Sequence, residues 1–510
     1  MVRSSSGRVA KNTAILYVRM TVVMLISLIA VRVLLKALGT EDYGVYNAIA
    51  GVVLLLNSVT GVLSSSIQRF YSFYQGKKDF SILGEVYSSS LVIISLFSLL
   101  VLVISETVGL WFVNNRLGIP IERLTAANWV FQFSVFSFIA TLYTIPYSAA
   151  VVSHEDMNIY AIISMLECLL KLVIALVLPF ILSDRLIVYS LLLFLVFLLN
   201  TFAYVIFCKR RYKELRLVRI RNKSLYKQIL SFSGWTMFGT FANVFNLQGN
   251  TILINVFFGP IVTAARAISL QIASALNAFC NSVVMALRPP MIKSYAENNF
   301  QYLLSVFYSS TKFIYYSMLM ICLPLIFEMP FILRIWLGEV SQDMIDFSRL
   351  IVIYSIILSL HFPITIIVQA TGVIKNYFVF VDSFTLLSMP LTYFLYRLGY
   401  SAVSAFWIMI IVFTLAHVIR LIILKKLMTE FSMKSYILKF IIPASIITLI
   451  TTLFVGLLHK LLGVIVLRFI LSIILTVCLV SVLLYFLGLS SRERIMVKNF
   501  ITNRVNRLKL

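Results

Sequence analysis

Residues 13–38 read TAILYVRMTVVMLISLIAVRVLLKAL and are followed by Gly39 and by TEDYGVYNAIA, residues 40–50. A helix needs roughly 20 consecutive apolar residues to cross the hydrocarbon core of a bilayer. The run 13–38 is longer than that, so it predicts a transmembrane helix. Basic residues precede it, as in a signal peptide, but the run is too long for one and no small-residue cleavage site follows. We therefore expect an uncleaved first span.

Similar apolar runs recur along the whole chain. The hydropathy pattern predicts fourteen spans, at 13–38, 44–67, 86–113, 125–152, 158–182, 186–208, 228–258, 261–287, 302–327, 347–370, 374–396, 402–424, 437–458 and 465–488. The gaps between them are short, and the longest polar stretch is residues 209–227. The sequence therefore leaves no room for a folded domain outside the membrane.

The composition excludes a soluble globular protein. Hydrophobic residues make up 61% of the 510 positions and charged residues 12%, and the mean hydropathy is +0.99. That leaves too little polar surface to cover a chain of this length in water. The five cysteines lie in or beside apolar runs, and no two have metal-ligand or redox spacing.

The net charge is +24, and the distribution of the basic residues along the chain agrees with the expected topology. With both termini in the cytoplasm, the inner segments carry about three times as many Lys and Arg residues as the outer loops, as the positive-inside rule requires. Nine of these cations lie in the linker KRRYKELRLVRIRNKSLYK, residues 209–227. We expect the linker to fix orientation and to lie against anionic lipid, and we expect no nucleic-acid partner.

A weak internal repeat relates the two halves of the chain. An apolar helix, a lone glycine and a second helix follow one another around Gly39 and again around Gly259. The same offset of about 220 residues places Arg69 near Arg288 and Tyr74 near Tyr295. Six spans separate the copies, so both halves have one orientation, which indicates a parallel repeat about an axis along the membrane normal.

The predicted fold is thus an all-α integral membrane protein of about fourteen transmembrane helices. Two six-helix lobes in parallel repeat are followed by two further C-terminal helices. In sequence order the expected parts are the first lobe at 1–208, the basic cytoplasmic linker at 209–227, the second lobe at 228–424, and two extra helices with a basic tail at 425–510.

Two stretches of the sequence resemble a known protein family. Residues 38–46, with the pattern LG-x-EDYG-x-Y, lie in a region from about 12 to 80 that resembles the opening of bacterial lipid-linked oligosaccharide flippases of the O-antigen (Wzx) type. Residues 230–300 resemble the opening of the second half of that family. These flippases belong to the multidrug/oligosaccharidyl-lipid/polysaccharide exporter superfamily. The resemblance implies two lobes around a central cavity, alternating access, and an undecaprenyl-diphosphate-linked sugar unit as substrate.

Charges within spans are the sharpest chemical signal, because each costs about 2.5–3.5 kcal/mol at the centre of the bilayer. The basic ones are Arg19, Arg32, Lys171, Arg266, Lys312 and Arg420, and the acidic ones are Glu106, Glu167 and Asp382. A cationic surplus suits a diphosphate, and an arginine fork can bind phosphate with two parallel hydrogen bonds. Arg32 lies 220° around the helix from Arg19 and near the span's end, so Arg19 is the preferred cavity residue of the first span.

Polar residues line one face of several spans. Such faces are either hydrogen-bonding seams between helices or the lining of a wet sugar path. On the second reading, the expected substrate-binding residues are Arg19, Arg266, Asn57, Ser64, Gln68, Asn243, Asn250, Asn277 and Asn281. We expect Glu167 to pair with Lys171 four residues later. Asp382 and Glu167 are candidates for binding a coupling ion, although Asp382 could equally pair with one of the cations.

No catalytic constellation, cofactor motif or metal cluster occurs in the sequence, so we expect a transporter that is not an enzyme. The expected partners are the lipid-linked oligosaccharide, membrane lipids, and polysaccharide polymerase and chain-length proteins. The expected location is the bacterial inner membrane. Two alternatives from the same superfamily stay open: a lipid II flippase and a cation-coupled multidrug exporter.

Overall fold

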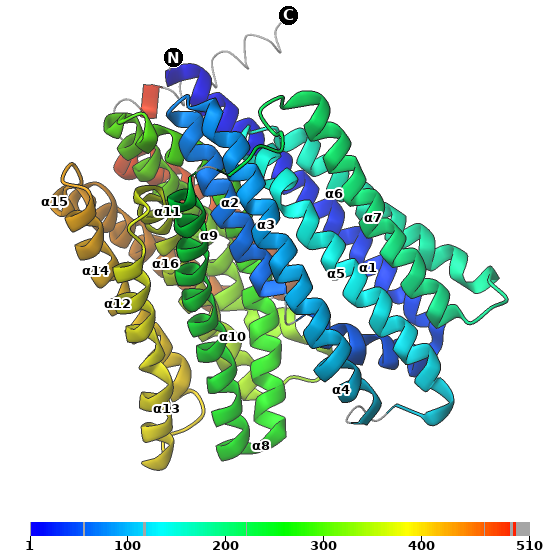
Figure 1. Cartoon of the computed structure of the whole chain (residues 1–510). Coiled ribbons are helices and arrows are strands. Elements are labelled where there is room, and N and C mark those ends of the chain that lie inside the picture. Colours follow the sequence, from blue (N-terminus) through cyan, green and yellow to red (C-terminus); the bar gives the residue numbers. More distant parts are fainter. Residues whose placement is uncertain are drawn as a thin grey trace, which may run out of the picture. The chain divides into compact units, whose positions relative to one another are not determined.

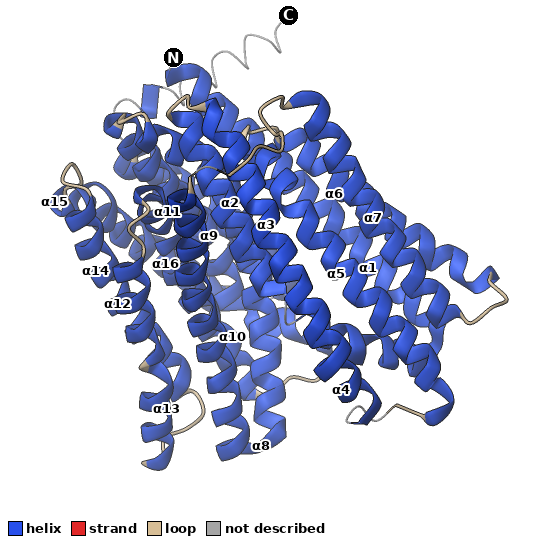
Figure 2. Ribbon diagram, in the orientation of Figure 1, coloured by secondary structure: helices blue, strands red, loops and turns tan. Residues whose placement is uncertain are grey.

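The computed structural model describes residues 2–54, 57–115, 119–220, 222–463, 465–489 and 493–495. The described residues are almost entirely helical and include no strand, as Figure 2 shows. The long apolar runs explain this, since a helix satisfies every backbone hydrogen bond within the segment where no water is present. The predicted all-helical membrane class is confirmed.

The first half of the chain forms seven of the described α-helices (Figure 1). They are α1 (Val2–Leu54), α2 (Asn57–Gly76), α3 (Phe80–Ile104), α4 (Leu110–Asn115), α5 (Leu124–Ser153), α6 (Met157–Val177) and α7 (Arg185–Arg211). A π-helical turn, η1 (Ser105–Gly109), joins α3 to α4, and the 3₁₀ turns η2 (Ile121–Arg123) and η3 (Leu178–Phe180) flank α5 and α6.

The second half contains α8 to α17 among the described residues. They are α8 (Lys223–Ala296), α9 (Phe300–Leu337), α10 (Gln342–Ser359), α11 (His361–Thr371), α12 (Lys375–Leu386), α13 (Ser388–Arg397), α14 (Ser404–Leu427), α15 (Met433–Tyr436), α16 (Ile442–Leu461) and α17 (Ile465–Leu483). Two π-helical turns, η4 (Ile437–Ile441) and η5 (Leu484–Gly488), precede α16 and end α17.

Twelve segments of the described residues are long and apolar enough to cross a membrane. The two other predicted spans are 44–67 and 228–258. The first includes residues 55 and 56, which lie outside the described part. The second is helical throughout but falls short in apolar content, because asparagine, glutamine and threonine recur along it.

The expected helix–glycine–helix pattern is confirmed in both halves. Gly39 interrupts α1 with φ 81° and ψ 170°, and Gly259 interrupts α8 with φ 81° and ψ −177°. A side chain is strained at this positive φ, which explains why glycine stands at both positions. The two interruptions are 220 residues apart and share one backbone conformation, so the repeat extends from the sequence to the local structure.

The turns after α2 and α8 repeat each other as well. Lys78 and Asn298, again 220 residues apart, adopt positive φ values of 56° and 57°. In each turn the next residue donates its backbone N–H five residues back, from Asp79 to Tyr74 at 3.0 Å and from Asn299 to Ser294 at 2.9 Å. This hydrogen-bond pattern is the Schellman motif, which closes a helix at its C-terminus.

The chain forms two compact units whose membership does not follow the sequence order. Unit 1 comprises residues 1–241, 282–299 and 369–378, and unit 2 comprises 242–281, 300–368 and 379–510. Within unit 1, α1 packs along α6, while α5 packs against both α2 and α7. Within unit 2, α10 contacts α9 and α14, and α17 contacts α9 and α16.

Two ionic clusters, the first in unit 1 and the second in unit 2, join separate helical segments. Asp42, in the EDYG stretch, pairs with Arg123, which also binds Asp184 at 2.8 Å. In unit 2, the buried carboxylate of Glu328 accepts hydrogen bonds from Arg468 at 2.7 and 2.8 Å and from His459 at 2.9 Å. This second cluster attaches the C-terminal helices α16 and α17 to α9.

Candidate functional site

Arg19 lies on α1 in unit 1 and is half-buried. Its Nε donates to Ser164 Oγ on α6 at 2.6 Å, and its guanidinium carbon lies 4.8 Å from the centre of the Tyr160 ring. No described residue accepts a hydrogen bond from its Nη1 or Nη2 atoms. The side chain is therefore oriented by α6 while its outer edge keeps the capacity to bind an anion.

Glu167 and Lys171 form the expected ion pair on α6, with Nζ and Oε1 2.6 Å apart. The second carboxylate oxygen of Glu167 accepts a hydrogen bond from Asn200 of α7 at 2.6 Å. Lys171 also lies 4.3 Å from the centre of the Phe197 ring. Both oxygens of Glu167 thus have protein partners, an arrangement suited to joining helices α6 and α7.

Arg266 occupies a different setting from the one expected of a cavity residue. Its side chain is fully buried in unit 2. Nε donates to Thr251 Oγ1 at 2.9 Å and Nη2 donates to the Leu247 carbonyl at 3.1 Å, while the Phe406 ring of α14 lies 5.2 Å away. Thr251 and Leu247 precede Gly259, so Arg266 links the part of α8 after this glycine to the part before it. We call the part before Gly259 the first arm of α8 and the part after it the second arm. The Nη1 atom of Arg266 has no partner among the described residues.

The polar face of the first arm of α8 divides into two parts. Asn250 is buried and donates to the Asn246 carbonyl at 2.9 Å. Asn246 in turn donates to the Thr385 carbonyl at 2.6 Å and to Ser388 Oγ at 2.5 Å. These asparagines therefore form a hydrogen-bonding seam to α12 and α13, whereas Asn243 is exposed. Asn246, which was not among the residues predicted from the sequence, is the centre of the seam.

The remaining predicted substrate-binding residues are spread over both units. On α2, Ser64 is half-buried and Gln68 is buried with an unpaired Nε2 among the described residues. On the second arm of α8, Asn277 is half-buried and Asn281 is exposed. The side chain of Asn57 lies outside the described part of the structure. Arg19, Ser64 and Gln68 belong to unit 1, and Arg266, Asn243, Asn250, Asn277 and Asn281 belong to unit 2.

Asp382 lies on α12 in unit 2. Its Oδ2 is buried and has no hydrogen-bond partner among the described residues. Arg420 of α14 is near enough to act on it electrostatically, although no hydrogen bond joins the two. The described residues contain no group of three or more His, Cys, Asp or Glu side chains that could hold a metal ion.

Arg69 is a buried cation whose contacts were not predicted from the sequence. This buried side chain of α2 donates from Nε to the Gln369 carbonyl at 3.0 Å and from Nη2 to the Ala370 carbonyl at 3.2 Å. A cation at a helix C-terminus is favoured by the helix dipole, and these carbonyls belong to the last turn of α11. The signal available in the sequence was only the alignment of Arg69 with Arg288 in the repeat.

A second contact in unit 1 joins the C-terminal ends of α2 and α8. At Gly76, a Cβ atom would lie 2.6 Å from the Lys293 carbonyl oxygen and 2.9 Å from Ala296 Cβ. Lys293 also pairs with Glu155 at 3.2 Å. We refer to this set as the Gly76–Lys293 contact. Together with Arg69, it attaches segments of the second half of the sequence to helices of the first half.

Solved transporter structures share this fold. The outward-facing conformation of a multidrug resistance MATE family transporter of the MOP superfamily has a TM-score of 0.71 at 13% identity, and the match covers 84% of this chain and 97% of that one. A MOP superfamily transporter from Pyrococcus furiosus gives 0.69 at 12% identity, covering 83% and 95%. The Vibrio cholerae MATE transporter VcmN in the bent form gives 0.66 at 14%, covering 84% and 97%. At such identities the similarity establishes the fold alone.

Sequence comparison establishes the family. A comparison with curated proteins found no significant match. The profile of the family described as "Polysaccharide biosynthesis protein" matches residues 9–296, which is more than half of the chain and includes most of α1, all of α2 to α7 and both arms of α8. The chain therefore belongs to the polysaccharide biosynthesis protein family, and it is a multi-pass membrane protein with the fold of the MOP superfamily transporters.

Proposed function

We propose that this protein flips undecaprenyl-diphosphate-linked oligosaccharide units from the inner to the outer leaflet of the bacterial cytoplasmic membrane. The units would serve synthesis of O-antigen, capsule or exopolysaccharide. The observation that carries the proposal is Arg19, an arginine inside the first span of a polysaccharide-biosynthesis family member, held by Ser164 with Nη1 and Nη2 unpaired among the described residues. A diphosphate is the part of such a substrate that a guanidinium binds best.

The remaining chemistry of the proposal is non-covalent. The half-buried or exposed side chains of Ser64, Asn243, Asn277 and Asn281 can exchange hydrogen bonds with sugar hydroxyls during passage. The glycines at 39 and 259 provide points at which the long helices α1 and α8 change direction. Transport by alternating access needs no bond to be made or broken, so no catalytic residue or cofactor is assigned.

Deletion of the gene tests the substrate class directly. We expect lipid-linked repeat units to accumulate on the cytoplasmic leaflet and the surface polymer to disappear, with both restored by the wild-type gene. Extraction of labelled polyprenyl-linked sugars and immunoblotting of the polymer measure the two effects. Normal polymer in a deletion strain without a paralogue would contradict the proposal.

A cation-coupled multidrug exporter is the second candidate. Asp382 favours it, because its buried Oδ2 has no hydrogen-bond partner among the described residues and such an oxygen can bind a proton or Na⁺. The same deletion strain distinguishes the two functions. A strain that becomes sensitive to cationic drugs while its polymer stays normal would support drug export instead.

The proposed topology places both termini and the 209–227 linker in the cytoplasm. The charge distribution supports it, since lysine and arginine concentrate on the cytoplasmic side of membrane proteins. Reporter fusions after Lys223 and after Arg507 are expected to be active as cytoplasmic reporters and inactive as periplasmic phosphatase. Strong phosphatase activity at either position would overturn the orientation.

A further inference from the structure

The basic linker, residues 209–227, includes the end of α7, the loop after it and the start of α8, and it is attached to the body of unit 1 by its own backbone and by one tyrosine. The Val218 N–H donates to Ser88 Oγ on α3 at 2.9 Å, and the Asn222 N–H donates to Glu85 Oε2 at 3.1 Å. At its start, the Tyr212 hydroxyl donates to Asp156 at 2.6 Å. The first two bonds hold the linker against α3 and the third holds its start at the beginning of α6, so its side chains are presented from a fixed backbone.

The described cations of this linker form no ion pair. Within the described part of the chain, eight of them are exposed and none is within salt-bridge distance of a carboxylate: Lys209, Arg210, Arg211, Lys213, Arg216, Arg219, Lys223 and Lys227. The acid of the linker, Glu214, is engaged elsewhere, with His154 at 2.8 Å. The positive charge is therefore available to a partner.

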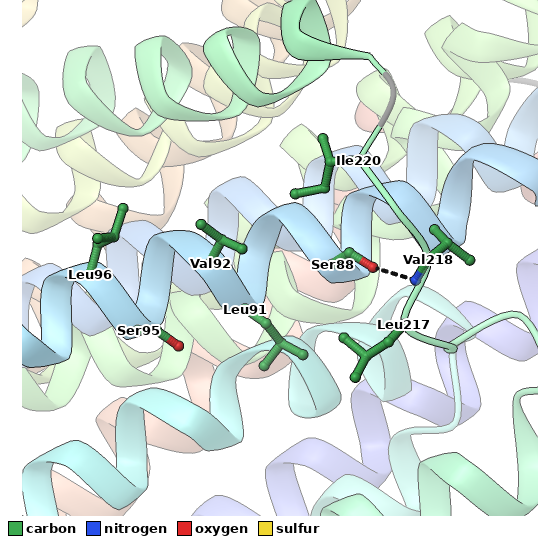
Figure 3. Close-up of a pocket in the computed structure, with 8 residues that line it drawn as sticks. All are labelled: Ser88, Leu91, Val92, Ser95, Leu96, Leu217, Val218 and Ile220. Carbon is green, nitrogen blue, oxygen red and sulfur yellow. Dashed lines mark hydrogen bonds between the residues drawn. The ribbon is translucent and has the colours of Figure 1, made fainter.

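An apolar groove lies where the linker meets α3, with a volume of about 440 Å³ (Figure 3). Its lining is Ser88, Leu91, Val92, Ser95 and Leu96 of α3 and Leu217, Val218 and Ile220 of the linker. From Ser88 to Leu96 the helix rises about 12 Å. Val92, Leu96 and Leu217 are 41%, 56% and 74% exposed, so the groove is open along its side.

We propose that this groove and the linker cations form a binding site for an anionic phospholipid of the cytoplasmic leaflet. One acyl chain lies against Val92 and Leu96, and the phosphate headgroup is bound by Arg216 and Arg219, which are adjacent in sequence to the lining residues of the linker. Each component suits this occupant: an apolar wall for the chain, unpaired guanidinium groups for the phosphate, and an exposed apolar face on α3 that continues through Leu99 and Leu100.

The direction in which the groove opens identifies its occupant as a lipid and not a soluble protein. Its open side continues onto α3, a segment apolar enough to span a membrane. A soluble partner would meet hydrocarbon along that helix, whereas a phospholipid has an apolar chain for the groove and an anionic group for the linker. The site does not depend on the substrate that the protein transports.

Native mass spectrometry of the purified full-length protein tests the site. The detergent-solubilised protein is titrated with phosphatidylglycerol, with zwitterionic phosphatidylethanolamine and with uncharged polyprenol. The charge variant is the double substitution Arg216→Gln and Arg219→Gln, and the groove variants are Val92→Trp and Leu96→Trp. The matched controls are Lys425→Gln with Lys426→Gln, two exposed cations in the last turn of α14, and Leu449→Trp at an exposed leucine of α16 in unit 2.

We expect one phosphatidylglycerol molecule to bind more tightly than the rest. Each cation near the phosphate contributes about 1 kcal/mol, or about fivefold, so the double arginine variant should bind it about 25-fold more weakly. Both groove variants should lose this molecule, and the controls should keep it. Equal binding of the zwitterionic lipid, or equal losses in the controls, would overturn the proposal.

Tighter binding of polyprenol than of phosphatidylglycerol would also overturn it, since the groove would then belong to the carrier of the substrate. Should Val92→Trp fail to fold, Leu96→Trp decides the role of the groove. The binding measurement contains no sugar substrate and requires no transport. Its failure would leave the proposed flippase function untouched, and failure of that function would leave the lipid site untouched.

Discussion

Arg19→Glu is expected to abolish surface-polymer synthesis in a complemented deletion strain while the protein stays in the membrane at its normal level. In the proposed function, the Nη atoms of Arg19 bind the diphosphate, and a carboxylate at that position would repel it. The existing contacts with Ser164 and Tyr160 are modest and lie at a half-buried site. Their loss should therefore not prevent folding.

The intermediate substitutions separate charge from geometry. A charge-assisted hydrogen bond contributes about 1.5–3 kcal/mol, so Arg19→Gln should lower the flipping rate at least about tenfold. Arg19→Lys keeps the charge but loses the fork, and it should fall between wild type and the glutamine variant. Polymer yield and accumulated lipid-linked units are the measurements, with membrane levels checked by immunoblotting.

Arg32 provides the matched control for this series. It is an exposed cation on the same helix, directed to another side of it. Arg32→Gln is expected to leave polymer yield unchanged, which would show that the loss in the Arg19 variants is specific to that position. Full activity of Arg19→Gln at normal expression would remove Arg19 from the substrate path.

Gly76→Ala is expected to block transport by preventing the close approach of α2 and α8. The added methyl group would lie 2.6 Å from the backbone oxygen of Lys293 and 2.8 Å from its Cα, and backbone atoms cannot rotate away as a side-chain end can. Overpacking of this kind costs about 1–3 kcal/mol, which would disfavour the arrangement by about 5- to 150-fold. The measurements are polymer yield and the thermal stability of the purified protein.

Gly61→Ala is the matched control because it lies in the same helix and a Cβ there would meet nothing within 4 Å. It should leave both polymer yield and stability unchanged. Lys293→Gln, which removes the ion pair with Glu155 without adding volume, should weaken transport less than Gly76→Ala. Wild-type transport by Gly76→Ala would mean that the Gly76–Lys293 contact is not needed in the cycle.

Local signals in the sequence were enough for the class of protein and for the repeat. Hydropathy is read over about 20 neighbouring residues, so apolar runs predicted the helical membrane fold. The glycines at 39 and 259 were recognisable because each stands alone between two helical runs. The Glu167–Lys171 pair was predictable because residues four apart share a helix face.

The tertiary structure alone decided what the polar residues of the spans contact. Arg69 binds carbonyls 300 and 301 residues away, and Asn246 bonds to α12 and α13 about 140 residues further on. Helical periodicity states which residues share a face, but not which helix that face meets. For the same reason the polar face of α8 could be read as a seam or as a sugar path, and the structure makes Asn246 and Asn250 a seam.

Arg266 and the linker groove also separate what the sequence predicts from what only the tertiary contacts determine. By itself the sequence determined that a cation lies inside the eighth span and that nine cations lie between the sixth and seventh. Only the tertiary structure shows that Arg266 is buried and hydrogen-bonded to the other arm of α8. It also shows that the linker lies along α3 beside an apolar groove. Burial and pairing depend on which segments meet in space, and that is set by packing between helices far apart in the sequence.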